Sequence, residues 1–133
     1  MKKDLKNLLA LAISLACAAR TTSANGTGID LSGYNSALVV LNPGTVTDGT
    51  HTPKVQESDD NSTYTDVAST DLIGSLSALA SNTIQTVGYI GTKRYIRPVI
   101  TVTGSPSTGA LASATVIRGD AIKQPVSSSA PDE

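Results

Sequence analysis

Lys-Val-Gln-Glu-Ser-Asp-Asp-Asn-Ser-Thr-Tyr-Thr-Asp-Val, residues 54–67, is the segment from which the fold can be predicted. Its centre, Ser58–Ser62, consists of short polar residues whose side chains bond back to nearby backbone and tolerate turn dihedrals. The valine, threonine and tyrosine residues on either side favour extended strands. The segment therefore predicts a β-hairpin, and we expect the rest of the chain to add strands around it.

Apolar runs and alternating segments elsewhere predict these further strands. Ala37–Leu41 is a continuous apolar run, which is typical of a central strand covered on both faces. Arg94–Thr103 alternates in character, but Pro98 lacks a backbone donor, so we expect this strand at a sheet edge or with a bulge. With strands also expected at 83–90 and 114–118, seven or eight short strands predict an all-β fold, an antiparallel β-sandwich or jelly roll.

The segment after the hairpin, Ser69–Asn82, allows two interpretations. Its aliphatic residues could line a short helix capped by Thr70 or Asp71. Gly74 and several serines disfavour a helix, so a loop with one helical turn fits equally well.

The first 20 residues also allow two interpretations. A basic beginning, an apolar run over 8–19 and the triplet Ala16-Cys17-Ala18 resemble a secretory signal. Asp4 in the basic region argues against a signal, and the run is too short to span a bilayer. We favour an N-terminal helical or extended arm, residues 1–20, that packs on its own domain or on a neighbouring chain. Helical spacing would place these residues along one side: Leu5, Leu8, Leu9, Ala12, Leu15 and Ala16.

Length and composition limit the classes of function. A chain of 133 residues suits one domain, here a β-sandwich over 21–126 followed by a flexible tail over 127–133. The net charge is −1 and aromatic residues make up 3% of the chain, all of them tyrosine, which argues against binding to nucleic acid or an anionic membrane. The single Cys17 excludes an intrachain disulfide and a cysteine-based zinc cluster.

No motif in the sequence indicates catalysis, a metal or a cofactor. His51 is the single histidine, lies beside a turn and is expected to be solvated. The acids around the hairpin, among them Asp59, Asp60 and Asp66, could suggest glycoside hydrolysis, but no tryptophan is available to line a sugar cleft. Asp59-x-Asn61 begins like a calcium loop without its glycine and closing glutamate. We therefore expect these acids to be solvated turn residues.

A series of short motifs covers most of residues 21–126. In order, they are Gly28-Ile-Asp-Leu-Ser-Gly-Tyr34, Asp48-Gly-Thr-His-Thr52, Lys54-Val-Gln-Glu-Ser-Asp-Asp60, Tyr64-Thr-Asp-Val67, Val87-Gly-Tyr-Ile-Gly91, Lys93-Arg-Tyr-Ile-Arg97 and Val116-Ile-Arg-Gly119. Their succession resembles small virion proteins of tailed bacteriophages. The resemblance implies a jelly-roll capsid cement or decoration protein on the outside of the phage head, with no catalytic residues.

The resemblance also implies partners. A cement protein binds the major capsid protein and copies of itself, and it stabilises the shell by bridging neighbouring capsomers through many weak contacts. The residues that we expect to contact these partners are Leu5, Leu8, Leu9, Leu15, Arg94 and Arg97.

Two other functions remain open on the sequence. A head–tail connector or tail-completion subunit is similar in size and would form one ring per particle. A secreted bacterial carbohydrate-binding module is the second, because Gln56–Asp60, Tyr64–Val67 and Arg94–Arg97 are similar to stretches of discoidin-like, galactose-binding jelly rolls.

Overall fold

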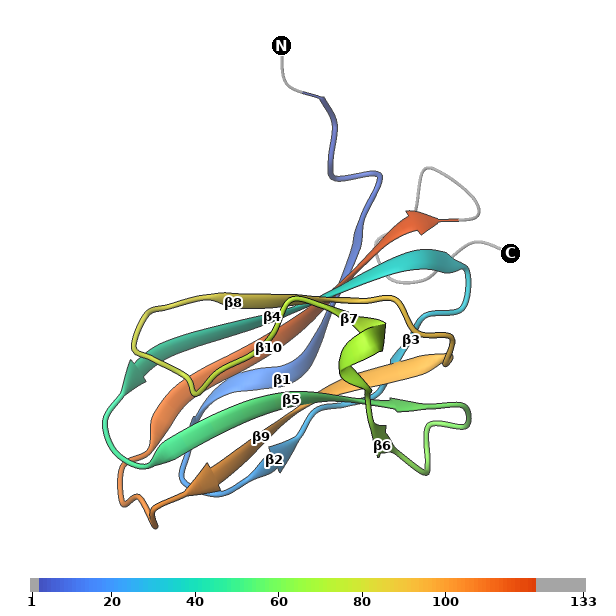
Figure 1. Ribbon diagram of the computed structural model, residues 1–133. Helices are drawn as coiled ribbons and strands as arrows, with labels where there is room; N and C mark the ends of the chain where they lie inside the picture. The colour runs from blue at the N-terminus through green and yellow to red at the C-terminus, as the bar shows by residue number, and fades with distance from the viewer. Residues whose placement is uncertain (1–2, 122–133) are drawn as a thin grey trace.

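The chain folds into two antiparallel sheets packed face to face, as the computed structural model shows for residues 3–121 (Figure 1). Sheet A has the order β1 (Ala10–Arg20), β10 (Ala110–Ala121), β4 (Tyr34–Val46), β8 (Gln85–Tyr89) and β7 (Leu72–Ile73). Sheet B has the order β2 (Ala24–Asn25), β9 (Tyr95–Thr103), β5 (Thr50–Ser58) and β6 (Thr65–Asp66), and β3 (Ile29–Asp30) also pairs with β9. The predicted all-β sandwich is confirmed.

The predicted hairpin is formed by β5 and β6, in which Gln56 pairs with Asp66. At its tip the Ser58 hydroxyl accepts the backbone amides of Asp60 and Asn61, at 3.2 and 3.0 Å. The Asp60 carboxylate in turn accepts the next two amides of the turn. Short polar side chains therefore hold this turn by bonding to its backbone, as the sequence predicts.

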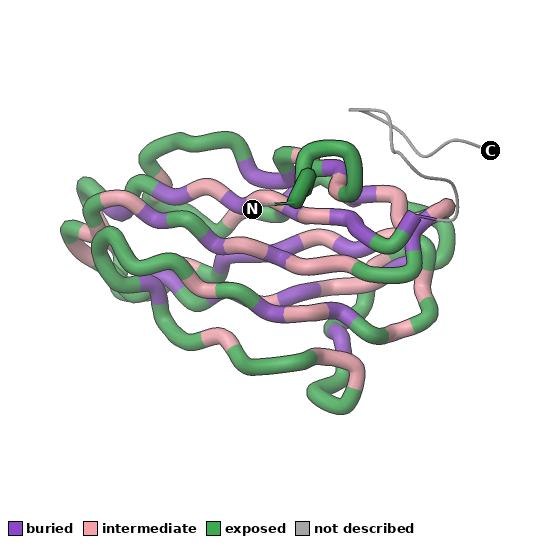
Figure 2. Tube along the Cα trace, turned by 90° about the horizontal axis from the view of Figure 1, so that it is seen from above, coloured by how far each residue is buried: buried purple, intermediate pink, exposed green. Residues whose placement is uncertain are grey.

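The core lies between the sheets and is built from residues of both (Figure 2). Buried positions alternate with more exposed ones along the strands, because successive side chains point to opposite faces of a sheet. The largest aliphatic side chains with at most 1% exposure are Val39, Leu41, Val87, Ile96, Ile100 and Val116.

The run Ala37–Leu41 lies in β4, the central strand of sheet A, but it is covered on one face only. Val39 and Leu41 point into the core with no exposed surface, whereas Leu38 and Val40 are partly exposed on the outside. The expectation of cover on both faces is therefore wrong for this run, since Leu38 and Val40 keep exposed surface on the outside of sheet A.

Pro98 does not lie at an edge, because β9 pairs with β5 on one side and with β2 and β3 on the other. The Pro98 carbonyl accepts the amide of Gly26 at 2.8 Å, in the gap between β2 and β3. Within a strand, the N–H and C=O of one residue point to the same side. The side of Pro98 that lacks an N–H therefore faces the gap between β2 and β3, where no strand residue needs that donor. This is why an interior strand tolerates the proline.

The helix expected in the first 20 residues is wrong. Residues 10–20 form β1, an integral strand of the sandwich that pairs with β10 from Ala10↔Arg118 to Arg20↔Ala110. Alanine and leucine favour helices by propensity. In this fold, however, β1 pairs with the backbone N–H and C=O groups of β10 and buries Leu15 in the core. The proposed boundary at residue 20 is therefore also wrong, and only residues 3–9 lead into the sandwich.

The segment 69–82 forms the loop with one helical turn, and the alternative of a longer helix is wrong. A 3₁₀ turn, η1 (Ser69–Asp71), precedes β7, and the loop that follows buries Leu79 against the core. The strand expected at 114–118 lies within the longer β10. The expected tail, 127–133, falls outside the described residues. Residues 3–121 include no helix long and apolar enough to cross a membrane.

Candidate protein-interaction surfaces

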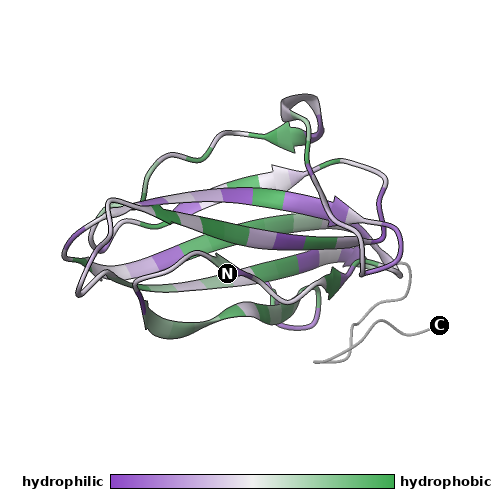
Figure 3. Cartoon of the chain, turned by 90° about the horizontal axis from the view of Figure 1, so that it is seen from below, coloured by the Kyte–Doolittle hydropathy of each residue, from purple (hydrophilic) through white to green (hydrophobic). Residues whose placement is uncertain are grey.

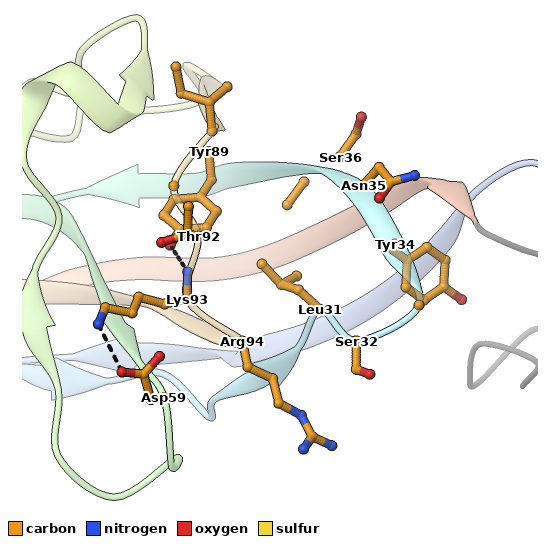
Figure 4. A pocket seen from close by; sticks show the side chains of 14 residues that line it. Leu31, Ser32, Tyr34, Asn35, Ser36, Asp59, Tyr89, Thr92, Lys93 and Arg94 are labelled. Atoms are coloured by element: carbon orange, nitrogen blue, oxygen red, sulfur yellow. Dashed lines mark hydrogen bonds and ion pairs between the residues drawn. The ribbon is translucent and has the colours of Figure 1, made fainter.

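A cleft of about 570 Å³ lies at one end of the sandwich, between the start of β4 and the loop from β8 to β9 (Figure 4). Two of its polar side chains, Lys93 and Tyr89, are held by neighbouring residues, whereas the buried hydroxyl of Tyr34 has no hydrogen-bond partner among the described residues. Lys93 Nζ lies 2.8 Å from Asp59 Oδ2. The hydroxyl of Tyr89 accepts the backbone amide of Lys93 at 3.0 Å and donates to Glu57 Oε1 at 2.8 Å. Burial and the neighbouring Glu57 raise the pKa of the Tyr89 phenol above its usual value, so this hydroxyl stays protonated.

The two candidate arginines are held by their own chain. Arg94 forms a two-pronged ion pair with Asp30, at 3.0 and 2.9 Å, and this pair lowers the pKa of the Asp30 carboxyl. Arg97 donates twice to Gln56 Oε1, at 3.0 and 2.8 Å, and its guanidinium lies 4.0 Å from the ring centre of Tyr64. These contacts make Arg94 and Arg97 weaker candidates for binding a partner than their charge suggests.

The candidate leucines fall into three environments. Leu5 and Leu8 are 63% and 40% exposed, on the lead segment 3–9 that projects from the sandwich (Figure 1). Leu9 is half-buried and lies against Gly119. Leu15 is 4% exposed and belongs to the core, so its expected role in binding a partner is wrong. The leucine candidates are thus reduced to Leu5, Leu8 and Leu9.

His51 is buried, with 1% of its surface exposed, and is not the solvated residue that the sequence predicted. Its Nε2 lies 3.0 Å from the carbonyl oxygen of Asp48, while its Nδ1 has no hydrogen-bond partner among the described residues. This position makes His51 part of the packing of sheet B rather than a group accessible to a substrate. No cluster of three or more metal-binding side chains occurs anywhere in 3–121.

A carboxylate whose role was not predicted from the sequence connects two turns at the other end of the sandwich. Asp48, in the turn from β4 to β5, accepts the backbone amides of Ser107 and Thr108 at 3.0 and 3.2 Å and also that of Gly109. These bonds lower the pKa of Asp48. The pair Asp48-Gly49 predicts only a local turn, because the loop that it binds lies far away in sequence.

The outside of sheet A is a second surface that was not predicted from the sequence. There the strand register places apolar side chains next to one another in rows across the sheet. One row runs Leu11, Ile117, Leu38, Gly88 and Ile73, and the next runs Ile13, Thr115, Val40 and Thr86. Together with Leu9, these residues form what we call the apolar face. The alternation of Leu38 and Val40 with Val39 and Leu41 was a signal for it, hidden because both sets are apolar.

On the opposite side of the molecule, the outside of sheet B carries polar residues such as Thr52, Lys54 and Thr101, and Figure 3 shows hydrophilic residues alternating with hydrophobic ones along its strands. Lys54 there pairs with Asp66 at 3.1 Å, and Gln56 connects Asp66 to Arg97. None of the residues of the apolar face carries a charge. The two outer surfaces therefore differ in chemistry, and the apolar one is the stronger candidate for contact with protein.

Architecture and surfaces together define an antiparallel β-sandwich with one apolar and one polar outer face. Among solved structures, the fold is similar to the crystal structure of PBSX exported protein XepA, with a TM-score of 0.53 and 17% sequence identity. The match covers 93% of this chain and 41% of that one, so this chain spans less than half the length of its structural neighbour. No protein-family model matches the sequence, and no curated protein matches it either.

Proposed function

We propose that this chain is a structural virion protein, a capsid cement or decoration protein that binds the outside of a phage head and bridges neighbouring capsomers. The main observation in support is the pair of exposed leucines, Leu5 and Leu8, on a segment that projects from an otherwise completed sandwich. Exposed leucines are costly in water, and burial of such a side chain against a partner contributes roughly 1.5–3 kcal/mol.

The sandwich and the lead segment have different roles in this proposal. The sandwich seats on the capsid surface and the segment 3–9 reaches the neighbouring capsomer, where Leu5 and Leu8 bind an apolar groove. Many such contacts repeated over a shell give strong retention, because each bound copy keeps its second contact at high effective concentration. The phage origin of the structural neighbour is in keeping with this setting.

Binding to heads that lack the protein tests the proposal. The double substitution Leu5→Asp, Leu8→Asp should abolish retention on such heads, while circular dichroism and thermal unfolding of the free protein stay unchanged. Lys3→Gln, Lys6→Gln is the matched control, since it also lowers the charge of the same segment by two but leaves both leucines in place. Normal occupancy of the leucine variant would remove the lead segment from the mechanism.

A further inference from the structure

The lead segment 3–9 contains a closed turn. The backbone amide of Leu8 donates to the carbonyl oxygen of Leu5 at 3.1 Å, and Lys6 and Asn7 lie between them. A β-turn of four residues brings its first and last Cα atoms within about 7 Å of each other. The turn therefore places the two exposed leucines next to one another.

The carboxylate of Asp4 holds this turn. Its Oδ1 accepts the backbone amide of Lys6 at 2.9 Å, and its Oδ2 accepts the side-chain amide of Asn7 at 2.7 Å. A short acidic side chain that bonds to the backbone two residues further on favours a turn. The bond from Asn7 lowers the pKa of Asp4, so the carboxylate is ionised at neutral pH and accepts these bonds strongly. Residues 4–8 are thus a small unit ordered by their own side chains.

These bonds do not contribute to the packing of the sandwich. They join residues two or three positions apart, and all of residues 3–8 are exposed. The segment supplies no strand to either sheet. Leu9, the residue after the turn, lies against Gly119 and connects the turn to the sandwich. Bonds that order only exposed residues have their effect on a surface that contacts those residues.

A preformed turn favours binding. A flexible segment loses conformational entropy when its side chains are fixed against a partner. A segment that already holds its bound conformation loses less and binds more tightly. Leu5 and Leu8, which are 63% and 40% exposed, would then enter a groove as a pair.

We infer that Asp4 is the positioning residue of the lead segment, because its carboxylate holds Leu5 and Leu8 in a turn that the partner binds as one unit. This inference rests on the proposed contact with the neighbouring capsomer and adds the residue that prepares the segment for it. The apolar groove of the partner is then wide enough for two adjacent leucine side chains, and is not a narrow channel for an extended strand. Asp4, the acid in the basic beginning of the chain, thereby acquires a role.

Two substitutions at Asp4 separate the turn from the charge. Asp4→Ala removes the charge and both acceptor oxygens, whereas Asp4→Asn removes the same charge but keeps an oxygen that accepts the amide of Lys6. Nuclear Overhauser contacts between Leu5 and Leu8 in the free, full-length protein report the turn, and cosedimentation with heads that lack the protein reports affinity. Asp4→Ala should lose the turn and bind heads about fivefold more weakly, on the scale of a lost capping bond. Asp4→Asn should keep both, and both variants should melt like the wild type.

The outcomes distinguish this inference from the proposed function. Wild-type affinity of Asp4→Ala would overturn the inference and leave the proposed function intact, as would a wild type without contacts between Leu5 and Leu8. Weak binding of an Asp4→Asn variant that keeps the turn would assign the effect to charge and would also overturn the inference. A wild type that shows the turn but does not bind heads would contradict the proposed function, and the role of Asp4 with it.

Discussion

The carboxylate of Asp48 binds both the backbone amide and the hydroxyl of Ser107, at 3.0 and 3.3 Å, although the two residues are 59 positions apart. Through this contact, the turn from β4 to β5 in effect caps the loop from β9 to β10. The contact depends on charge, because hydrogen bonds from amides are stronger to an ionised carboxylate than to a neutral one.

This contact predicts how stability depends on pH. The folded protein lowers the pKa of Asp48 and lowers that of Asp60 to about 2, in both cases mainly through backbone amides. A group with a depressed pKa contributes stability above its unfolded value, about 3.9, and this contribution is lost as pH falls through the folded value. We therefore expect the urea midpoint to fall between about pH 4 and pH 2.

The substitutions Asp48→Asn and Asp60→Asn should each lower the urea midpoint at neutral pH and make it less sensitive to acid. Asp59→Asn removes an equal charge from an exposed residue of the same hairpin as Asp60 and is the control. An acid response identical to that of the wild type in both test variants would contradict this account of the turns.

Substitution of a buried and of an exposed leucine in the N-terminal region should affect stability differently. Leu15→Ala removes a core side chain and should lower the free energy of unfolding by about 2–5 kcal/mol. Leu5→Ala removes an exposed side chain and should leave that free energy almost unchanged. Urea denaturation of the two variants measures the difference. Equal effects would show that β1 is not packed as described.

Truncations separate the lead segment from β1. Deletion of residues 3–9 should leave a folded sandwich with a similar melting temperature, because that segment contributes no strand. Deletion of residues 3–20 removes β1, exposes the ladder groups of β10 and opens the core at Leu15, so the product should be unfolded or aggregated. Circular dichroism and size-exclusion chromatography report both outcomes, and a folded, monomeric product of the longer deletion would contradict the role of β1.

The hydroxyl of Tyr89 joins the end of β8 to sheet B. Tyr89→Phe removes its bonds to Glu57 and to the amide of Lys93 and leaves the buried ring in place. Each net hydrogen bond contributes about 0.5–1.5 kcal/mol to stability, and the Glu57 carboxylate and the Lys93 amide that lose their partner add to the cost. We therefore expect the free energy of unfolding to fall by roughly 1–3 kcal/mol. Thermal unfolding of the variant measures this loss, and a melting temperature equal to that of the wild type would show that water replaces both bonds.

The sequence predicted those parts of the fold in which residues interact with their close neighbours along the chain. The hairpin tip could be predicted because the side chains of Ser58 and Asp60 bond to their own turn. The position of β1 could not, since the alanines and leucines of 10–20 suit a helix and only the distant β10 supplies their ladder. The interior position of Pro98 could not be predicted either, because the gap that accommodates this proline lies between β2 and β3, which are distant in sequence.

The candidate site was less predictable than the fold. Leu15 and Leu8 look alike in sequence, but Leu15 is buried within β1 and Leu8 is exposed on the lead segment before that strand. The apolar face requires the pairing of β10, β4 and β8 to bring Ile117, Leu38 and Gly88 into one row. A surface assembled across strands has no signature along any one of them.

A cryo-EM map of intact phage particles tests the proposed role most directly. The account predicts density for the two-sheet sandwich in many copies over the outside of the head, with the lead segment 3–9 reaching a neighbouring capsomer. Density for this chain confined to one ring at the head–tail junction, or its absence from the particle, would contradict the assignment as a cement protein.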